Sequence, residues 1–185
     1  MLQRENTGLI VIDIQGKLAQ LVHDSDAFIE RCAKLIQGAQ ALDLPIIWVE
    51  QNPDKLGSTV DKLQSLLSVQ SLVSPQNPIS KFSFSACDEA SFIKSIQSSG
   101  VKQFLVCGIE THICVYQTAM GLNKRGLGAH IVSDCVSSRT LENKDLALQK
   151  LSRNGIEITG LEMCLYELVK DCRAEEFKAI LQLIK

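Results

Sequence analysis

The 185-residue sequence is poor in several features, and each shortage argues against a class of protein. It has four prolines and no internal repeat or low-complexity segment, so no interdomain linker is indicated. No apolar run approaches the length of a membrane span, and the residues after Met1 lack the features of a secretory leader. We therefore expect neither a membrane partner nor a cleaved targeting segment.

Charge and cysteine content narrow the class further. Lys plus Arg total 19 against 21 Asp plus Glu, a net charge of −2 with the two signs mixed, so we expect no nucleic acid partner. The seven cysteines are odd in number and include no CxxC pair, which argues against a disulfide framework and for a reducing compartment. We expect a cytoplasmic protein, and the length predicts a single domain over residues 1–185.

Short apolar runs alternate with segments of helical periodicity along the chain. The runs predict strands at residues 8–13, 44–49, 72–73, 101–107, 129–134 and 156–159. Helical periodicity is found near residues 25–39, 60–67, 88–97, 111–124, 141–153 and at the end of the chain, with Ser25 and Asp88 as expected N-caps. We predict a three-layer, doubly wound α/β fold with a mainly parallel sheet of about six strands and helices on both faces.

In such sheets ligands bind beyond the carboxyl ends of the strands. This rule selects residues that directly follow predicted strands, namely Asp13, Glu50, Gln51, Asp134 and the turn 108–114. Cys114 would lie in the first turn of a helix, where unpaired N–H groups and the helix dipole favour the thiolate. Alternatively, it is a small buried hydrophobe, as most free cysteines are.

Asp13, Lys81 and Cys114 form a set suited to acyl transfer. A nearby cation lowers the pKa of a thiol, and a carboxylate can carry protons to and from it. Each residue also has an ordinary structural explanation. Asp13 could be a turn carboxylate and Lys81 a solvated surface lysine.

Three segments carry a resemblance to a known family. They are IVIDIQ at 10–15, KFSFSA at 81–86 and GIETHICV at 108–115, and they resemble the three signatures of the isochorismatase-like cysteine hydrolases. Segments 134–139 and 160–168 also resemble later parts of that family. The resemblance implies that Cys114 is the nucleophile, Asp13 the base that moves its proton, and Lys81 the cation between them.

The resemblance also implies the form of the turn before the nucleophile. It places a non-proline cis peptide at Ile109–Glu110 and directs the backbone N–H groups of Glu110 and Cys114 at one oxyanion. Because these donors belong to the backbone, substitution of Glu110 by Ala is expected to leave its donor intact.

Five residues are candidates for the substrate pocket, namely Gln15, Leu18, Gln51, Phe82 and His112. Leu18 stands where the resembled pattern often has an aromatic residue. His112 and Cys114 are two residues apart and do not share a helix face, so a pocket-rim or solvated histidine is favoured over a Cys–His pair. Phe82 and Phe84 alternate and are predicted to pack under their loop, with Phe82 also a candidate ligand contact.

The same resemblance bears on cofactors. The segment EQNPDKLG at 50–57 replaces the Asp-x-His metal motif of the nicotinamidase branch, and no histidine lies between His23 and His112. It is similar instead to an isochorismatase-domain subgroup without that metal site. We therefore expect no metal and no other cofactor.

Together these features predict a metal-independent cysteine hydrolase that cleaves the C–N bond of a small amide-type substrate through a Cys thioester. Isochorismatases proper lack this cysteine and cleave an ether, so Cys114 argues against that reaction. The alternatives are a non-enzymatic interaction protein that retains the fold, and a redox-responsive thiol protein. The apolar face of the last helix could pack on the domain or on a second subunit. Similar proteins form homo-oligomers, which we expect here too.

Overall fold

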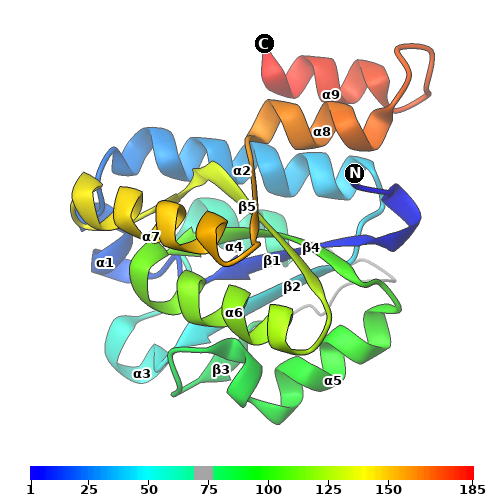
Figure 1. Ribbon diagram of the computed structural model, residues 1–185. Coiled ribbons are helices and arrows are strands. Elements are labelled where there is room, and N and C mark those ends of the chain that lie inside the picture. The colour runs from blue at the N-terminus through cyan, green and yellow to red at the C-terminus, as the bar shows by residue number, and fades with distance from the viewer. Residues whose placement is uncertain (69–76) are drawn as a thin grey trace.

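The computed structural model describes residues 1–68 and 77–185. Its centre is a six-stranded sheet in the order β3-β2-β1-β4-β5-β6, in which all neighbouring strands are parallel (Figure 1). The strands are β1 (Thr7–Ile12), β2 (Ile46–Gln51), β3 (Ile79–Lys81), β4 (Gln103–Ile109), β5 (Gly128–Ser137) and β6 (Glu157–Thr159). The predicted three-layer, doubly wound fold is confirmed.

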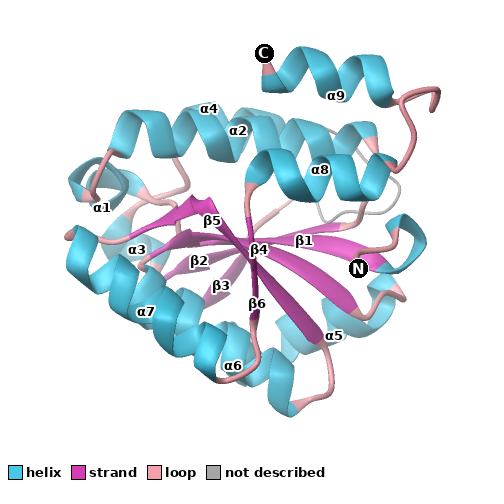
Figure 2. Cartoon of the chain, turned by 45° about the horizontal axis from the view of Figure 1, so that its top comes forward, coloured by secondary structure: helices cyan, strands magenta, loops and turns pink. Residues whose placement is uncertain are grey.

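Helices cover both faces of this sheet. They are α1 (Gly16–Leu21), α2 (Ser25–Ala41), α3 (Pro53–Leu56), α4 (Asp61–Leu67), α5 (Ala90–Ser99), α6 (Tyr116–Lys124), α7 (Leu141–Arg153), α8 (Leu161–Val169) and α9 (Phe177–Ile184). Figure 2 shows α2, α4, α8 and α9 on one face and α5, α6 and α7 on the other. Each face therefore has its own apolar core.

The central strand β1 shows why the apolar runs predicted the sheet. Its six residues are all buried, because helices cover it on both sides. Leu9 and Val11 pack in the core under α2 and α8, whereas Ile10 and Ile12 pack in the core over α5 and α6. Successive side chains of a strand point to opposite faces, so the run is continuous rather than alternating.

Some predicted elements differ from the structure, and one falls on residues that the structure does not describe. The strand expected at residues 72–73 lies outside the described residues, and the third strand of the structure is Ile79–Lys81, which pairs with β2. The helix expected to begin at Asp88 begins at Ala90, because the Ser85 hydroxyl accepts the N–H of Cys87 and starts a separate 3₁₀ turn, Ala86–Asp88. Similarly, Asp24 rather than Ser25 precedes the first residue of α2.

The last helix packs on its own domain. Figure 1 shows α9 beside α8, and Ile180 is buried in the core that also contains residues of α2 and α8. Phe177 and Ile184 are partly buried against the same core. Among the described residues, no helix is both long and apolar enough to cross a membrane.

Candidate active site

Asp13, Lys81 and Cys114 approach the same edge of the sheet from three strands. Asp13 follows β1, Lys81 ends β3, and Cys114 lies in the turn after β4. The Lys81 Nζ atom lies 2.7 Å from Asp13 Oδ2, and both side chains are buried, with 0% and 3% of their surface exposed. Cys114 is 7% exposed and close enough for both charges to act on its thiol. The structure thus brings together the three residues that the motifs selected.

Lys81 is held entirely by oxygen acceptors. Besides Asp13, its ammonium donates to Gln51 Oε1 at 2.6 Å and to the backbone carbonyls of Ser83 and Phe84 at 3.2 and 3.3 Å. A buried ammonium needs such partners, because moving an ion out of water into a protein interior costs on the order of several kcal/mol when no hydrogen bonds or counterion compensate it. The ordinary explanation of Lys81 as a solvated lysine is therefore wrong.

A left-handed residue places the carboxylate. Asp13 has a φ of 53°, and its N–H donates to the Val49 carbonyl at 3.2 Å while its own carbonyl accepts the Gln15 N–H at 2.8 Å. For a residue other than glycine this conformation costs roughly 1–2 kcal/mol. Strain of this kind is concentrated at functional sites. The turn ends β1 abruptly and keeps the carboxylate at the sheet edge beside Lys81.

The protonation of the site follows from burial. Burial raises the pKa of Asp13 above its ordinary 3.8, although the Lys81 charge opposes the shift. Burial, assisted by the Asp13 charge, raises the pKa of the Cys114 thiol to about 12, and Lys81 only partly offsets this. The expectation of a resting thiolate is therefore wrong, because desolvation and a nearby carboxylate outweigh the helix start. The resting thiol carries its proton.

The turn between β4 and Cys114 has an unusual backbone. Gly108 has a φ of 127°, and a Cβ on it would lie 2.0 Å from the carbonyl oxygen of Ile12, so only glycine fits. The Ile109–Glu110 peptide bond is cis. Residues Thr111–Val115 then form a π-helical turn that leads directly into α6. Such turns are often found at functional sites.

The Glu110 side chain is also engaged. Its carboxylate is buried, and Oε1 accepts both the backbone N–H and the Nε–H of Arg139, each at 3.1 Å. Arg139 lies in the loop after β5. The expectation that Glu110→Ala leaves its backbone donor intact stays a prediction, and the contact with Arg139 shows that the side chain also ties two loops together.

The two glutamines predicted to line the pocket are structural ties. Gln15 is fully buried; its Oε1 accepts the Gln51 N–H at 2.7 Å and its Nε2 donates to the carbonyls of Gln51 and Gly57 at 3.1 and 2.6 Å. Its amide therefore fastens the loop after β2. Gln51 holds Lys81 and donates to the Phe82 carbonyl at 2.8 Å.

The other three predicted pocket residues differ in position. Leu18 is half-buried and packs against the core under α2. Phe82 and Phe84 are 70% and 55% exposed, so the prediction that they pack under their loop is wrong. The alternation was correct, but Lys81 occupies the inward position. His112 is half-buried, with Nδ1 3.0 Å from Ser138 Oγ, rather than paired with Cys114.

Two side-chain contacts at the site were not predicted, although Glu50 and the turn that contains Glu110 had been selected as following strands. Glu50, at the end of β2, is buried with its Oε1 accepting the N–H and the hydroxyl of Thr59 at 2.6 and 2.7 Å. The Glu110–Arg139 pair joins residues 29 positions apart. No local pattern marks either contact, and only the position of both carboxylates after predicted strands points to them.

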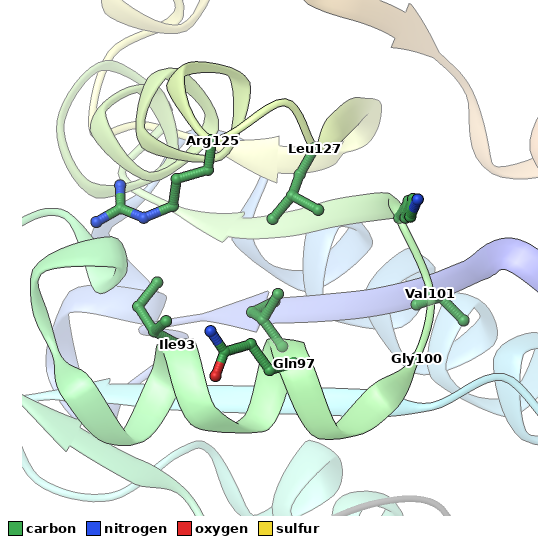
Figure 3. A pocket seen from close by; sticks show the side chains of 8 residues that line it. Ile93, Gln97, Gly100, Val101, Arg125 and Leu127 are labelled. Carbon is green, nitrogen blue, oxygen red and sulfur yellow. The ribbon is translucent and has the colours of Figure 1, made fainter.

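Two further features of the described chain concern metal binding and cavities. Across residues 1–68 and 77–185, no group of three or more His, Cys, Asp or Glu side chains is arranged to hold a metal ion. A cavity of about 440 Å³ lies between α5 and the segment after α6, lined by Ile93, Gln97, Arg125 and Leu127 among others (Figure 3). Val101 and Lys102, just before β4, also line it, so it lies at the opposite edge of the sheet from Cys114.

A doubly wound parallel sheet with a thiol, a carboxylate and an ammonium at its carboxyl edge defines a three-layer α/β protein with a candidate active site at the usual ligand edge of such sheets. Comparison with known sequences makes this assignment more specific. The isochorismatase domain matches residues 7–163, and the chain belongs to the isochorismatase family.

Individual relatives support this assignment. Isochorismatase domain-containing protein 1 of Danio rerio is 40% identical over 152 residues, which are 82% of this chain and 51% of that protein. The chain thus spans about half the length of this relative. Among solved structures, MAR1 ribonuclease from Caenorhabditis elegans is 32% identical with a TM-score of 0.89, covering 99% of this chain and 91% of its own.

A second solved structure was determined with bound small molecules. YcaC from Pseudomonas aeruginosa, with hexane-2,5-diol and covalent acrylamide, is 25% identical with a TM-score of 0.88. The match covers 98% of this chain and 90% of that one. Both neighbours share the whole fold described above.

Proposed function

We propose that the protein is a cysteine hydrolase that cleaves the C–N bond of a small amide-type substrate through a thioester on Cys114. The observation that carries this proposal is a buried, protonated thiol beside a buried Asp13–Lys81 ion pair. A thiol with a pKa of about 12 is a poor nucleophile until a base removes its proton. Asp13 is the base that this site offers.

The proposed reaction has two halves. Asp13 takes the thiol proton as the sulfur attacks the carbonyl carbon, and the N–H groups of Glu110 and Cys114 bind the oxyanion. The C–N bond then breaks, the amine leaves with the proton from Asp13, and an acyl thioester remains. Water next gives a proton to Asp13 and attacks the thioester. Asp13 returns that proton to the sulfur, which releases a carboxylic acid.

The raised pKa of Asp13 suits this role. A carboxylate with a pKa above 3.8 is a stronger base, and its acid form is more fully populated when the amine must be protonated. The charge of Lys81 opposes the effect of burial on the pKa of Asp13 and so favours the ionised carboxylate. The two side chains therefore set the proton balance together.

The choice of a C–N bond rests on the thiol. The reaction for which the family is named breaks a C–O bond and needs no cysteine, whereas acyl transfer from an amide needs a nucleophile. Acrylamide is covalently bound in the YcaC structure, and acrylamide reacts with nucleophiles such as thiols. We take this as support for a reactive nucleophile within the shared fold.

The remaining properties complete the proposal. We propose one domain over residues 1–185, with catalysis that needs neither metal nor cofactor. We propose a cytoplasmic location from the odd number of cysteines and the lack of a CxxC pair in the sequence. We also propose that the protein forms a homo-oligomer, with the exposed Phe82 and Phe84 as candidates for the contact.

The main test is a panel of small carboxamides assayed for release of ammonia or amine. We expect turnover by the wild type and by Cys172→Ala, which removes the exposed thiol. Cys114→Ala should lose about 10⁴-fold or more, as expected when a nucleophile is removed. An acyl adduct on Cys114, seen by mass spectrometry after rapid quenching, would identify the intermediate. The proposal fails if no amide is turned over, or if Cys114→Ala keeps full activity.

The same panel should include single-stranded RNA, because one structural neighbour is named a ribonuclease. The mixed charges and net charge of −2 give little attraction for a phosphate backbone, so we expect no cleavage. Peroxide treatment tests the redox alternative. The high pKa of Cys114 keeps thiolate scarce at neutral pH, so we expect slow oxidation.

A further inference from the structure

We propose that the Glu110–Arg139 ion pair positions the oxyanion-binding N–H groups of the nucleophile turn. Arg139 acts here as a positioning residue, because it touches Glu110 rather than the reacting atoms. This inference rests on the proposed function and adds to it a specific device. Glu110 links the two parts of the site. Its backbone carbonyl bonds to the nucleophile turn, and its carboxylate bonds to Arg139 in the loop after β5.

The backbone carbonyl of Glu110 shapes the turn. It accepts the N–H of Ile113 at 3.0 Å and that of Val115 at 3.3 Å. In an α-helix this carbonyl would instead accept the N–H of the fourth residue on, which is Cys114. The bond from Val115 belongs to the wider π register and passes over Cys114. The N–H of Cys114 is thereby released from its usual helical partner and available to a substrate oxygen.

The carboxylate of Glu110 fixes where that carbonyl sits. It is 7% exposed and receives two converging N–H donors from Arg139, each at 3.1 Å. A buried carboxylate deprived of its cation would seek water, and the short side chain would move the backbone with it. The ion pair therefore holds the turn against the loop after β5.

Arg139 is itself held by the residue before it. The Ser138 carbonyl accepts the His23 N–H at 2.8 Å, and Ser138 Oγ lies 3.0 Å from Nδ1 of His112. Ser138 is fully buried. The loop is thus fixed to the start of α2 and to the nucleophile turn, so it provides a rigid support for the guanidinium.

Loss of this support should separate two reactions of the same thiol. Hydrolysis of an amide develops an oxyanion and needs both N–H groups in place. Alkylation by iodoacetamide displaces iodide and develops no oxyanion, yet it still needs Asp13 and Lys81 to release the thiol proton. A general loosening of the site would slow both reactions.

The experiment compares Arg139→Ala and Arg139→Lys with Arg173→Ala, all in a Cys172→Ser background. Arg173 also pairs with a carboxylate, that of Asp171 at 2.6 Å, but on the surface. For Arg139→Ala we expect kcat on an amide substrate to fall roughly 10- to 100-fold with KM within about threefold, as for a misplaced donor. Alkylation should stay within about twofold. Arg139→Lys should recover part of the loss, and Arg173→Ala should match the parent.

Amide hydrogen exchange decides the inference without reference to turnover. In Arg139→Ala, the backbone amides of residues 110–115 should exchange faster than in the parent, whereas those of residues 81–84 should exchange at the same rate. If the wild type hydrolyses no amide, the proposed function fails, and exchange still tests the device. Unchanged kcat and exchange, a parallel loss of alkylation, or a higher KM for anionic amides alone would each overturn the inference.

Discussion

The two halves of the site use different kinds of chemical group, charged side chains in one and backbone N–H groups in the other. On the β1–β3 side, Asp13, Gln51 and Lys81 contribute side chains and charges, held by hydrogen bonds among themselves. On the β4–β5 side, the turn contributes backbone N–H groups, which we infer are placed by Gly108 and by the Glu110–Arg139 ion pair. The difference teaches that one half should respond to changes of charge and the other to changes of backbone shape.

The largest expected effect is on the charged half. Asp13→Asn removes the proposed base, so kcat/KM on an amide substrate should fall about 10²- to 10⁴-fold. Glu50→Gln is the matched control, since Glu50 is an equally buried carboxylate at the end of the neighbouring strand but is bonded to Thr59. Equal losses in the two variants would show that Asp13 has no special role.

Substitution in the charged half should also lower the stability of the fold. Asp13→Asn leaves the Lys81 ammonium buried without its counterion, which should lower the free energy of unfolding by about 3–5 kcal/mol. Adding Lys81→Met removes the stranded charge, so the double variant should recover most of this loss while remaining inactive. Denaturant titration of the single and double variants measures both changes. A double variant no more stable than Asp13→Asn would contradict the explanation.

A backbone change should act on the other half. Gly108→Ala places a Cβ 2.0 Å from the Ile12 carbonyl oxygen, so the loss of unfolding free energy should exceed the roughly 3 kcal/mol that bounds ordinary substitutions. In Gly100→Ala the residue also has a positive φ, 72°, but no atom lies within 4 Å of the new Cβ. That control should lose about 1–2 kcal/mol. Similar losses in both would remove the steric argument.

The pH dependence distinguishes the halves again. Asp13 must be ionised to act, and its pKa is raised, so the acid limb of kcat/KM should lie above pH 3.8. The effect on stability has the opposite sign. Because the folded state favours protonated Asp13, the contribution of Asp13 to the free energy of unfolding is fully present below pH 3.8 and is lost as pH rises through the raised pKa.

Removing the cation should extend this shift. Lys81→Met loses the charge that lowers the pKa of Asp13, so the acid limb should move to higher pH and alkylation of Cys114 should need more alkaline solution. Arg139→Ala, on the backbone half, should leave both profiles in place. Profiles of kcat/KM and of alkylation rate test this. An acid limb that does not move in Lys81→Met would contradict the prediction.

The smallest effect should lie outside both halves. Phe82 is 70% exposed, so Phe82→Ser should change the free energy of unfolding by no more than about 0.5 kcal/mol. Any consequence should appear in KM or in subunit association, measured by kinetics and by sedimentation. A large loss of stability would show that Phe82 packs more than its exposure indicates.

Sequence alone predicted the parts that depend on local pattern. The central strands were found because burial on both faces demands continuous apolar runs. The strand β3 was missed because Ile79–Lys81 is short and contains a serine and a lysine. The pKa of Cys114 was misjudged because burial and, after it, the charge of Asp13 raise it, and an argument from the start of a helix includes neither. The Glu110–Arg139 ion pair joins residues 29 positions apart, and no helix or strand spacing predicts a contact over that distance in the sequence.

The close contact between Gly108 and Ile12 has a consequence for how such a protein can change. Neighbouring strands lie about 4.8 Å apart, and β1 and β4 are neighbours, so sheet spacing sets the separation of their ends. Asp13 and the turn that carries Cys114, which we propose exchange a proton, thus directly follow two neighbouring strands at the centre of the sheet. Substitutions in loops such as 52–58 and 82–85 are therefore expected to leave the separation of Asp13 and the nucleophile turn unchanged, because the pairing of β1 with β4 sets it.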